Sequence, residues 1–130
     1  MKTKYVYPAI FEKEESGYSV IFPDLGIATS GEDLAEAILM ARDALCLMLY
    51  DMEESKQTIP AASPVMDVRT EENQFVSLIE CDTIEYRKFF NNKAVKKTLS
   101  IPAWLNTLAE REEINFSAVL QKALKAELNI

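Results

Sequence analysis

A long helical pattern between residues 32 and 54 constrains the fold more than any other feature of the chain. Its apolar residues recur at steps of three and four, so they lie along one side of a helix that must pack on an apolar layer. The stripe consists of Leu34, Ile38, Ala41, Leu45, Met48 and Met52. Three further apolar residues, Leu39, Cys46 and Tyr50, lie off the stripe. We expect these three either to contact a later strand or to form a surface for a partner.

The residues before this helix have the pattern of a β-hairpin followed by a third strand. Residues 5–11 and 18–22 are rich in aromatic and β-branched side chains, and a polar turn that ends in Gly17 separates them. Residues 27–29 predict a short third strand, and residues 74–81 predict a fourth strand after a proline-containing loop. The order strand, strand, strand, helix, strand predicts a small α+β layer.

The last third of the chain predicts one short strand and two helices. Residues 98–101 alternate polar and apolar side chains, as a strand with one buried face does. Pro102 suits the first turn of a helix that ends near Glu112, and Asn115 is the expected N-cap of a second helix. A module of roughly 40 residues buries too little apolar surface alone, and a lone strand leaves both edges unpaired. Pairing of two chains would solve both problems.

The charge of the chain is divided unevenly between these parts. Residues 1–82 contain 6 Lys and Arg against 16 Asp and Glu, a balance of −10. Residues 83–130 contain 8 against 5, a balance of +3, which brings the whole chain to −7. Such asymmetry is typical of a protein with two different partners. The chain has no histidine, so the commonest general base and the commonest metal ligand are both missing.

The sequence contains no signal for export or membrane insertion. No apolar run approaches the roughly 20 residues that span a bilayer, and the first residues lack the apolar region of a secretory signal. We therefore expect a cytoplasmic protein whose two cysteines, Cys46 and Cys81, are reduced and buried. Nothing in the pattern indicates a cofactor.

Several groups of residues in the first half match the signature of one family. Residues 18–25 read Tyr-Ser-Val-Ile-Phe-Pro-Asp-Leu, and residues 29–34 read Thr-Ser-Gly-Glu-Asp-Leu. Glu36-Ala37 and the run Ala41-Arg42-Asp43-Ala44-Leu45 follow on the helix. This pattern resembles the HicB-type antitoxins of type II toxin–antitoxin systems. The proline that usually follows the leucine of Phe-Pro-Asp-Leu is absent, which we expect to alter the turn but not the fold.

The resemblance implies a fold and a partner for the first 82 residues. The fold would be a partial RNase H-like domain, and the partner would be a small basic toxin of the HicA type that cleaves mRNA. The acidic charge of this region suits a basic partner. Candidate toxin contacts are Asp24, Leu39 and Tyr50, although Asp24 also follows a proline in a turn, where its side chain ordinarily bonds to the backbone.

The last 37 residues resemble a second known arrangement. Residues 96–105, together with residues 115–117, are similar to ribbon-helix-helix proteins and to the C-terminal module of many HicB antitoxins. The resemblance implies a homodimer, or a tetramer if the N-terminal domains also pair. The expected dimer core consists of Leu99, Ile101, Trp104, Leu105, Leu120 and Leu124.

The alternation along the predicted ribbon assigns roles in binding operator DNA. If Leu99 and Ile101 face the core, the opposite side of the ribbon faces the major groove. Lys97 would reach phosphate from the edge of the ribbon, and the start of the second helix would bind another phosphate. The DNA-contacting residues are thus predicted to be Lys96, Lys97, Thr98, Ser100, Asn115, Phe116 and Ser117. The alternative is a dimerisation module whose polar face is only solvated.

These observations predict three parts: a toxin-binding domain at 1–82, a linker at 83–93 and a ribbon-helix-helix domain at 94–130. The last domain would repress the operon that encodes the toxin and the antitoxin. One alternative is a metal-dependent nuclease that uses front-domain acids. The acids are Asp24, Glu32, Asp33, Glu36 and Asp43, but four of them lie on a single helix, so we expect no catalytic and no metal site. Another alternative is a stand-alone transcriptional regulator whose first domain senses a small molecule or forms oligomers.

Overall fold

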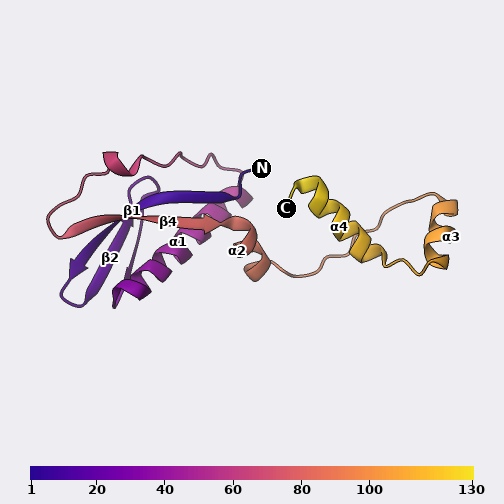
Figure 1. Cartoon of the computed structure of the whole chain (residues 1–130), viewed down its shortest axis with the longest axis horizontal. Coiled ribbons are helices and arrows are strands. Elements are labelled where there is room, and N and C mark those ends of the chain that lie inside the picture. Colours follow the sequence, from indigo (N-terminus) through magenta and orange to yellow (C-terminus); the bar gives the residue numbers. More distant parts are fainter. The chain divides into compact units, whose positions relative to one another are not determined.

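A four-stranded antiparallel sheet with a long helix against it forms the first part of the chain (Figure 1). The computed structural model describes all residues, 1–130, and they divide into two units, Lys2–Asn92 and Lys93–Ile130. We call these the N-terminal unit and the C-terminal unit. The strands of the N-terminal unit are β1 (Lys4–Glu14), β2 (Gly17–Phe22), β3 (Ile27–Gly31) and β4 (Gln74–Asp82), in the order β3-β2-β1-β4. The predicted α+β class is confirmed.

The hairpin and the fourth strand form where the sequence predicts them. β1 pairs antiparallel with β2, and its Phe11 lies opposite Val20. Gly17 closes the turn with φ +123°, and a Cβ there would lie 2.2 Å from the carbonyl oxygen of Gly31. β4 pairs antiparallel along nearly all of β1. Pro8 has β4 on one side only, because the pairing with β2 begins at Ile10, so the missing N–H of the proline is tolerated.

Helix α1 (Leu34–Glu54) covers one face of this sheet. Its N-cap is Asp33, whose carboxylate accepts a hydrogen bond from the backbone N–H of Glu36 at 2.8 Å. An acid thus caps the helix. A short 3-10 helix, Val65–Asp67, interrupts the loop that follows α1.

The buried stripe of α1 differs from the predicted one. Ala41 and Leu45 are buried as expected, but Leu34 is exposed and Met48 is half-buried. The reason is that small residues allow the helix to approach the sheet closely, so they mark the contact line better than large ones do. The buried residues of α1 are Ala37, Ala41, Leu45, Cys46 and Leu49.

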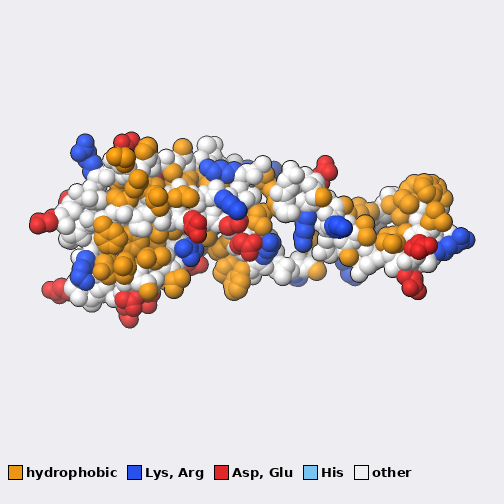
Figure 2. Space-filling view, in the orientation of Figure 1, with side chains coloured by type: hydrophobic (Ala, Val, Ile, Leu, Met, Phe, Trp, Pro, Cys, Tyr) orange, Lys and Arg blue, Asp and Glu red, His pale blue; other side chains and the backbone are white.

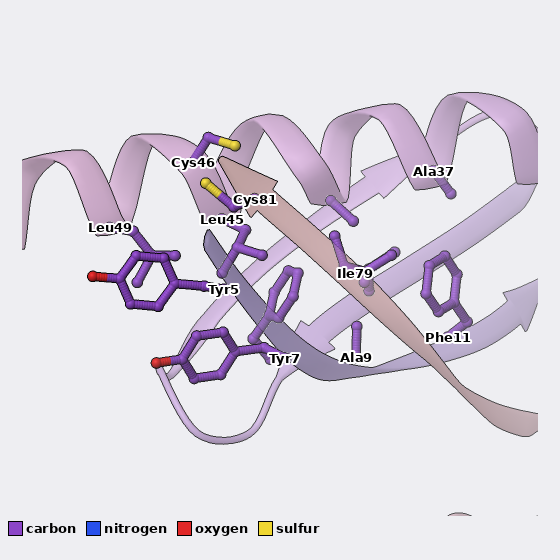
Figure 3. Close-up of a cluster of buried hydrophobic side chains, with 13 residues drawn as sticks. Tyr5, Tyr7, Ala9, Phe11, Ala37, Leu45, Cys46, Leu49, Ile79 and Cys81 are labelled. Atoms are coloured by element: carbon purple, nitrogen blue, oxygen red, sulfur yellow. The ribbon is translucent and has the colours of Figure 1, made fainter. Parts of the chain in front are cut away.

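Alternate residues of the strands complete the core below this helix (Figure 3). Residues Tyr5, Tyr7, Ala9 and Phe11 of β1 all point to the same side, as the period of two of a strand requires. Phe11 and Phe22 are completely buried. The whole buried set is Tyr5, Tyr7, Ala9, Phe11, Val20, Phe22, Ala37, Ala41, Leu45, Cys46, Leu49, Ile79 and Cys81.

Residues expected to begin a linker instead form helix α2 (Thr83–Phe90) within the N-terminal unit. The carboxylate of Asp82 caps it by accepting hydrogen bonds from the N–H groups of Ile84 and Glu85. Tyr86 packs against Tyr50 of α1, and Arg87 pairs with Glu53 and Glu54 at the end of that helix, which holds the segment in place. Among residues 83–93, only those after Phe90 lie outside regular structure.

The C-terminal unit consists of α3 (Ala103–Arg111) and α4 (Phe116–Leu128), which match the two predicted helices. Asn115 caps α4 as predicted, because its side chain accepts a hydrogen bond from the N–H of Ala118 at 3.0 Å. The predicted strand at residues 98–101 is absent from the single chain. A strand needs a neighbour for its backbone groups, and this chain offers none. None of the four helices combines the length and apolar character that crossing a bilayer requires.

Candidate functional site

A groove opens on the N-terminal unit where four elements meet. The start of β1, the middle of α1, the end of β4 and helix α2 surround a volume of about 770 Å³. The groove is lined by Lys4, Tyr5, Val6, Leu39, Arg42, Asp43, Cys46, Glu80, Cys81, Asp82, Glu85, Tyr86, Phe89 and Phe90. No two of these elements are neighbours in the chain except β4 and α2, so only the fold brings the lining together.

Large apolar side chains in this groove are exposed to solvent. Leu39 is 63% exposed, Phe89 81% and Phe90 60%. Val6 is half exposed at the other side of the groove. Groups of apolar side chains left in water in this way mark surfaces for binding proteins or other apolar partners. Leu39 therefore belongs to a surface, as one of the two sequence-based interpretations expected, whereas Cys46 belongs to the core.

The rim of the groove is acidic. Asp43, Glu80, Asp82 and Glu85 contribute four carboxylates, and only Lys4 and Arg42 contribute positive charge. Asp82 already accepts hydrogen bonds from the first N–H groups of α2. The remaining three acids are all exposed. Exposed apolar side chains at the mouth of the groove, together with an acidic rim, favour a partner that has an apolar anchor surrounded by basic residues.

A row of aromatic rings fixes α2 against α1. The ring of Tyr86 lies 5.4 Å from that of Tyr50 and 4.5 Å from that of Phe90, between ring centres. Phe89 packs edge-on against Phe90 at 4.8 Å. The guanidinium of Arg87 lies 4.7 Å above the ring of Tyr50. Tyr50 thus supports the groove from beneath but does not line it.

A partly buried carboxylate, that of Glu53, holds three elements together beside the groove. It accepts hydrogen bonds from the hydroxyl of Tyr5 at 3.1 Å and from the hydroxyl of Thr83 at 3.0 Å. Arg87 pairs with Glu53 at 3.1 Å and with Glu54 as well. Burial and the hydrogen bond to Glu53 raise the pKa of Tyr5 to about 12. The hydroxyl of Tyr5 therefore stays protonated and continues to donate over the whole physiological range.

Asp24 lies away from this groove and joins two loops. Its carboxylate accepts hydrogen bonds from the backbone N–H of Ser63 at 3.0 Å and from the Ser63 hydroxyl at 2.5 Å. The nearby Tyr7 hydroxyl donates to the carbonyl of Pro60. These bonds hold the long loop after α1 against the β2–β3 turn. Asp24 thus has a structural role, but through a residue 39 positions away and not through the backbone of its own turn.

The acids considered for nuclease chemistry do not converge. Asp33 caps α1, and Glu36 accepts a hydrogen bond from the backbone N–H of Glu32 at 3.2 Å. Asp43 lies farther along the same helix, on the rim of the groove. No three carboxylate or thiol side chains of the chain gather around a point that would hold a metal ion.

The predicted DNA-binding and dimer residues form a second candidate surface, on the C-terminal unit. Lys96, Lys97, Thr98 and Ser100 are exposed in an extended segment without hydrogen-bond partners in this chain. Asn115, Phe116 and Ser117 stand at the start of α4, also exposed. Of the expected dimer core, only Leu120 is half-buried, and the others are exposed: Leu99, Ile101, Trp104, Leu105 and Leu124. One chain alone therefore does not bury this core.

Apolar side chains along both helices of the C-terminal unit face solvent (Figure 2). Trp104 is 66% exposed, and Leu99 just before it is 57% exposed. No residue from 93 to 130 is buried. The unit has helices with apolar sides but nothing in the chain to cover them.

Sequence reasoning missed the aromatic side of the groove. Phe89 and Phe90 were placed in the linker, although Tyr86, Phe89 and Phe90 have helical spacing and follow the capping residue Asp82. That spacing, with the N-cap in front of it, was the available signal. Nothing in the sequence indicated that Glu80, Glu85 and Arg42 lie at one groove. They come together only because β4 pairs with β1.

Comparison with known proteins identifies the family. The family described as "HicB_like antitoxin of bacterial toxin-antitoxin system" matches residues 7–124. The chain belongs to this family. The HicB-like relatives include "Antitoxin HicB 2" of Photorhabdus laumondii, which is 41% identical over 58 residues, 44% of this chain and 42% of that protein. A protein of Haemophilus phage HP1, described as an uncharacterized 14.9 kDa protein in the rep-hol intergenic region, is 30% identical over 104 residues, 77% of this chain and 75% of its own.

Solved structures of HicB-like proteins have a similar fold. A chain in a toxin–antitoxin complex from Streptococcus pneumoniae is 28% identical, has a TM-score of 0.60, and is matched over 95% of this chain and 99% of that one. The HicB antitoxin of Burkholderia pseudomallei has a TM-score of 0.55 at 22% identity, over 92% of this chain and 96% of its own. The second similarity concerns the fold alone.

Proposed function

We propose that this HicB-like chain is an antitoxin that binds and masks a small basic toxin of the HicA type with its N-terminal unit. Family membership supports the antitoxin role, and the similar chain from S. pneumoniae was solved in a toxin–antitoxin complex. The observation that carries the assignment to this unit is the groove, which joins exposed apolar side chains to an acidic rim. The fold of the unit would be the partial RNase H-like one that the family resemblance implies.

The charge of the N-terminal unit fits this partner. Residues 2–92 contain 8 Lys and Arg against 17 Asp and Glu, a balance of −9. Such a field accelerates encounter with a basic protein and keeps the polyanionic RNA substrate away from the complex. Inhibition then consists of covering the active site of the toxin. The antitoxin itself contributes no catalytic group and needs no cofactor.

Leu39 is the central contact that we assign to the toxin, with Phe89 and Phe90 beside it. Tyr50 acts indirectly, because it holds α2 in place through Tyr86. Asp24 contributes by shaping the neighbouring loops and does not contact the toxin in this proposal. Aromatic residues such as these two phenylalanines are enriched in the buried centre of protein–protein interfaces.

The toxin surface is tested by a matched pair of leucine substitutions. Leu39 and Leu47 are both exposed on α1, but only Leu39 lines the groove. The chain is co-expressed with the product of the adjacent small reading frame, and growth and co-purification are measured. Leu39→Glu should lose both growth rescue and co-purification, and Leu47→Glu should keep both. Equal behaviour of the two variants contradicts the groove as the interface, and failure of the wild-type chain contradicts the antitoxin role.

The C-terminal unit, in our proposal, forms a ribbon-helix-helix homodimer that binds operator DNA and represses the operon. Its support is the complete absence of buried residues in a unit with two well-formed amphipathic helices. A second copy would pair the segment around residues 98–101 into a two-stranded ribbon and cover the exposed Trp104 and Leu105. Lys96, Thr98 and Ser100 would then face the major groove together from both chains.

Phosphate contacts flank this ribbon in the proposed complex. Lys97 reaches the backbone from the ribbon's edge, and the N–H groups at residues 115–117 bind a phosphate at the start of α4. Residues 93–130 contain 6 Lys and Arg against 4 Asp and Glu, so two copies present a positive surface although the whole chain is acidic. Binding to the chain's own promoter DNA, measured by gel shift, should weaken steeply as salt rises. A flat salt response contradicts DNA binding through phosphates.

A further inference from the structure

The floor of the groove contains the only two cysteines of the chain, side by side. Cys46 comes from the middle of α1 and Cys81 from the end of β4. Both thiols are free, and the two side chains lie beside each other where α1 packs on β4 (Figure 3). The two side chains hydrogen bond to each other. Residues separated by 35 positions in the sequence thus form a thiol pair through the packing of a helix on a strand.

The two thiols are chemically different because of their surroundings. The hydrogen bond from Cys81 lowers the pKa of Cys46, and the positive charge of Arg42 one turn earlier acts in the same direction. Burial and the carboxylates of Asp43 and Asp82 oppose this shift. The hydrogen bond to Cys46 and burial raise the pKa of Cys81. Cys46, which also has the greater exposure, is therefore the better nucleophile of the pair.

Access to the pair is limited but present. Cys46 is 7% exposed and Cys81 is 3% exposed, and both line the groove. A molecule as small as a peroxide reaches the sulfur of Cys46 through the groove, whereas a large disulfide reagent does not. Neither thiol has a role in the antitoxin function proposed above, in which apolar side chains at the groove's mouth bind the partner.

We propose that Cys46 and Cys81 are a redox modification site, at which a peroxide converts the two thiols into a reversible disulfide between α1 and β4. The Cys46 thiolate attacks one peroxide oxygen, the O–O bond breaks, and the departing hydroxide takes up a proton, which gives a sulfenic acid and one water. The Cys81 sulfur then attacks the Cys46 sulfur, and an S–S bond replaces the S–O bond. The hydroxide that leaves takes the Cys81 proton as the second water, so two thiols lose two electrons to one peroxide.

The disulfide ties the helix layer of the N-terminal unit to its sheet. It links two residues on either side of a chain segment that contains the end of α1, the long loop and most of β4. This link lowers the conformational entropy of the unfolded chain and so stabilises the folded one. We expect the melting temperature of the N-terminal unit to rise by at least about 5 °C on oxidation and to fall back on reduction. This inference does not depend on the proposed toxin or DNA binding, because both the reaction and the melting are measured on the chain alone.

The test treats the full-length chain with a small excess of hydrogen peroxide and follows the free thiols and the intact mass. The expected result is loss of both thiols together, a mass lower by two hydrogen atoms, a peptide in which Cys46 is joined to Cys81, and recovery with dithiothreitol. The reaction should be at least about tenfold faster in the folded chain than in the chain unfolded in urea, because folding places the sulfurs together.

Two comparisons make the outcome decisive. Cys81→Ser should stop at a sulfenic acid on Cys46 and show no rise in melting temperature. Cys46→Ser should react far more slowly, because it leaves only the more deeply buried thiol, which is 3% exposed. Independent oxidation of the two thiols, a disulfide only between chains, or equal rates in folded and unfolded protein would each overturn the proposal.

Discussion

The two units of this chain differ in whether they bury a core of their own. The N-terminal unit encloses Phe11 and Phe22 completely between a sheet and a helix, and its buried polar groups all have partners. The C-terminal unit has equally regular helices, yet Trp104 and its other large apolar side chains face solvent. Regular local structure therefore does not by itself imply an independent fold. In our proposal, a second chain covers the apolar side of the C-terminal unit.

The largest effect on the difference between the two units is expected from a charge placed in the proposed dimer core of the C-terminal unit. Leu99→Asp should abolish the dimer and operator binding together, because it buries a carboxylate where two strands would pair. Molar mass from light scattering and gel shift measure the two losses. Ser100→Asp is the matched control. The side chain of Ser100 faces outward from the proposed ribbon, so this substitution should leave the dimer intact. A dimeric Leu99→Asp chain contradicts the assigned facing of the strand.

A cavity in the core of the N-terminal unit tests whether that unit is stabilised by its own buried residues. Phe11→Ala should lower the free energy of unfolding of this unit by about 3–5 kcal/mol, since the ring is completely buried. Denaturant unfolding followed by tyrosine fluorescence measures the loss. Leu105→Ala, in the C-terminal unit, should leave that transition unchanged and weaken only dimerisation. A common loss in both transitions would mean that the units do not fold separately.

Removal of the two ribbon hydroxyls separates DNA binding from toxin binding. Thr98→Ala with Ser100→Ala should weaken operator binding by about 1–3 kcal/mol for each lost base contact, and toxin neutralisation should be unchanged. Gel shift and growth rescue give the two readouts. The variant should remain a dimer, which distinguishes it from Leu99→Asp. Loss of neutralisation would contradict the division of roles between the units.

The smallest expected effect concerns the polar contacts beside the groove. Glu53→Ala should destabilise the N-terminal unit by about 1–3 kcal/mol, because Arg87 loses a partly buried ion pair and the hydroxyls of Tyr5 and Thr83 lose their charged acceptor. Only the backbone carbonyls of Lys2 and Thr3 then remain as acceptors for the two hydroxyls. Glu54→Ala is the matched control. Glu54 is exposed and contacts only Arg87, so the change should be within about 0.5 kcal/mol. Thermal melting of the two variants, side by side, measures the difference, and equal melting temperatures would contradict the role of Glu53.

Features that depend on neighbouring residues were predictable from the sequence. The hairpin follows from alternating strands around Gly17, and the cap of α4 follows from the single residue Asn115. The residues of α1 that contact the sheet were predicted only in part. The prediction relied on the spacing of large apolar residues such as Leu34, which is exposed in the structure. The residues that approach the sheet most closely are small ones, Ala37 among them. Their importance becomes visible only when the sheet is in place.

The groove could not be predicted, because its lining comes from four elements that only tertiary pairing brings together. Leu39 was recognised as lying off the main stripe, but its neighbours Phe89 and Phe90 were assigned to a linker. The strand predicted at residues 98–101 is a different case, because its sequence pattern is clear but the strand does not form in the single chain. Its alternation is a property of the sequence, whereas its formation needs a partner strand that one chain does not contain.

The molar mass of the purified full-length chain, measured by light scattering over a range of concentrations, tests the central difference between the two units most directly. A mass of twice 14.7 kDa, or of four times that value if the N-terminal units also pair, is the result that the exposed core of the C-terminal unit predicts. A mass of 14.7 kDa at every concentration would contradict it, because the C-terminal unit would then be stable with its apolar side in water.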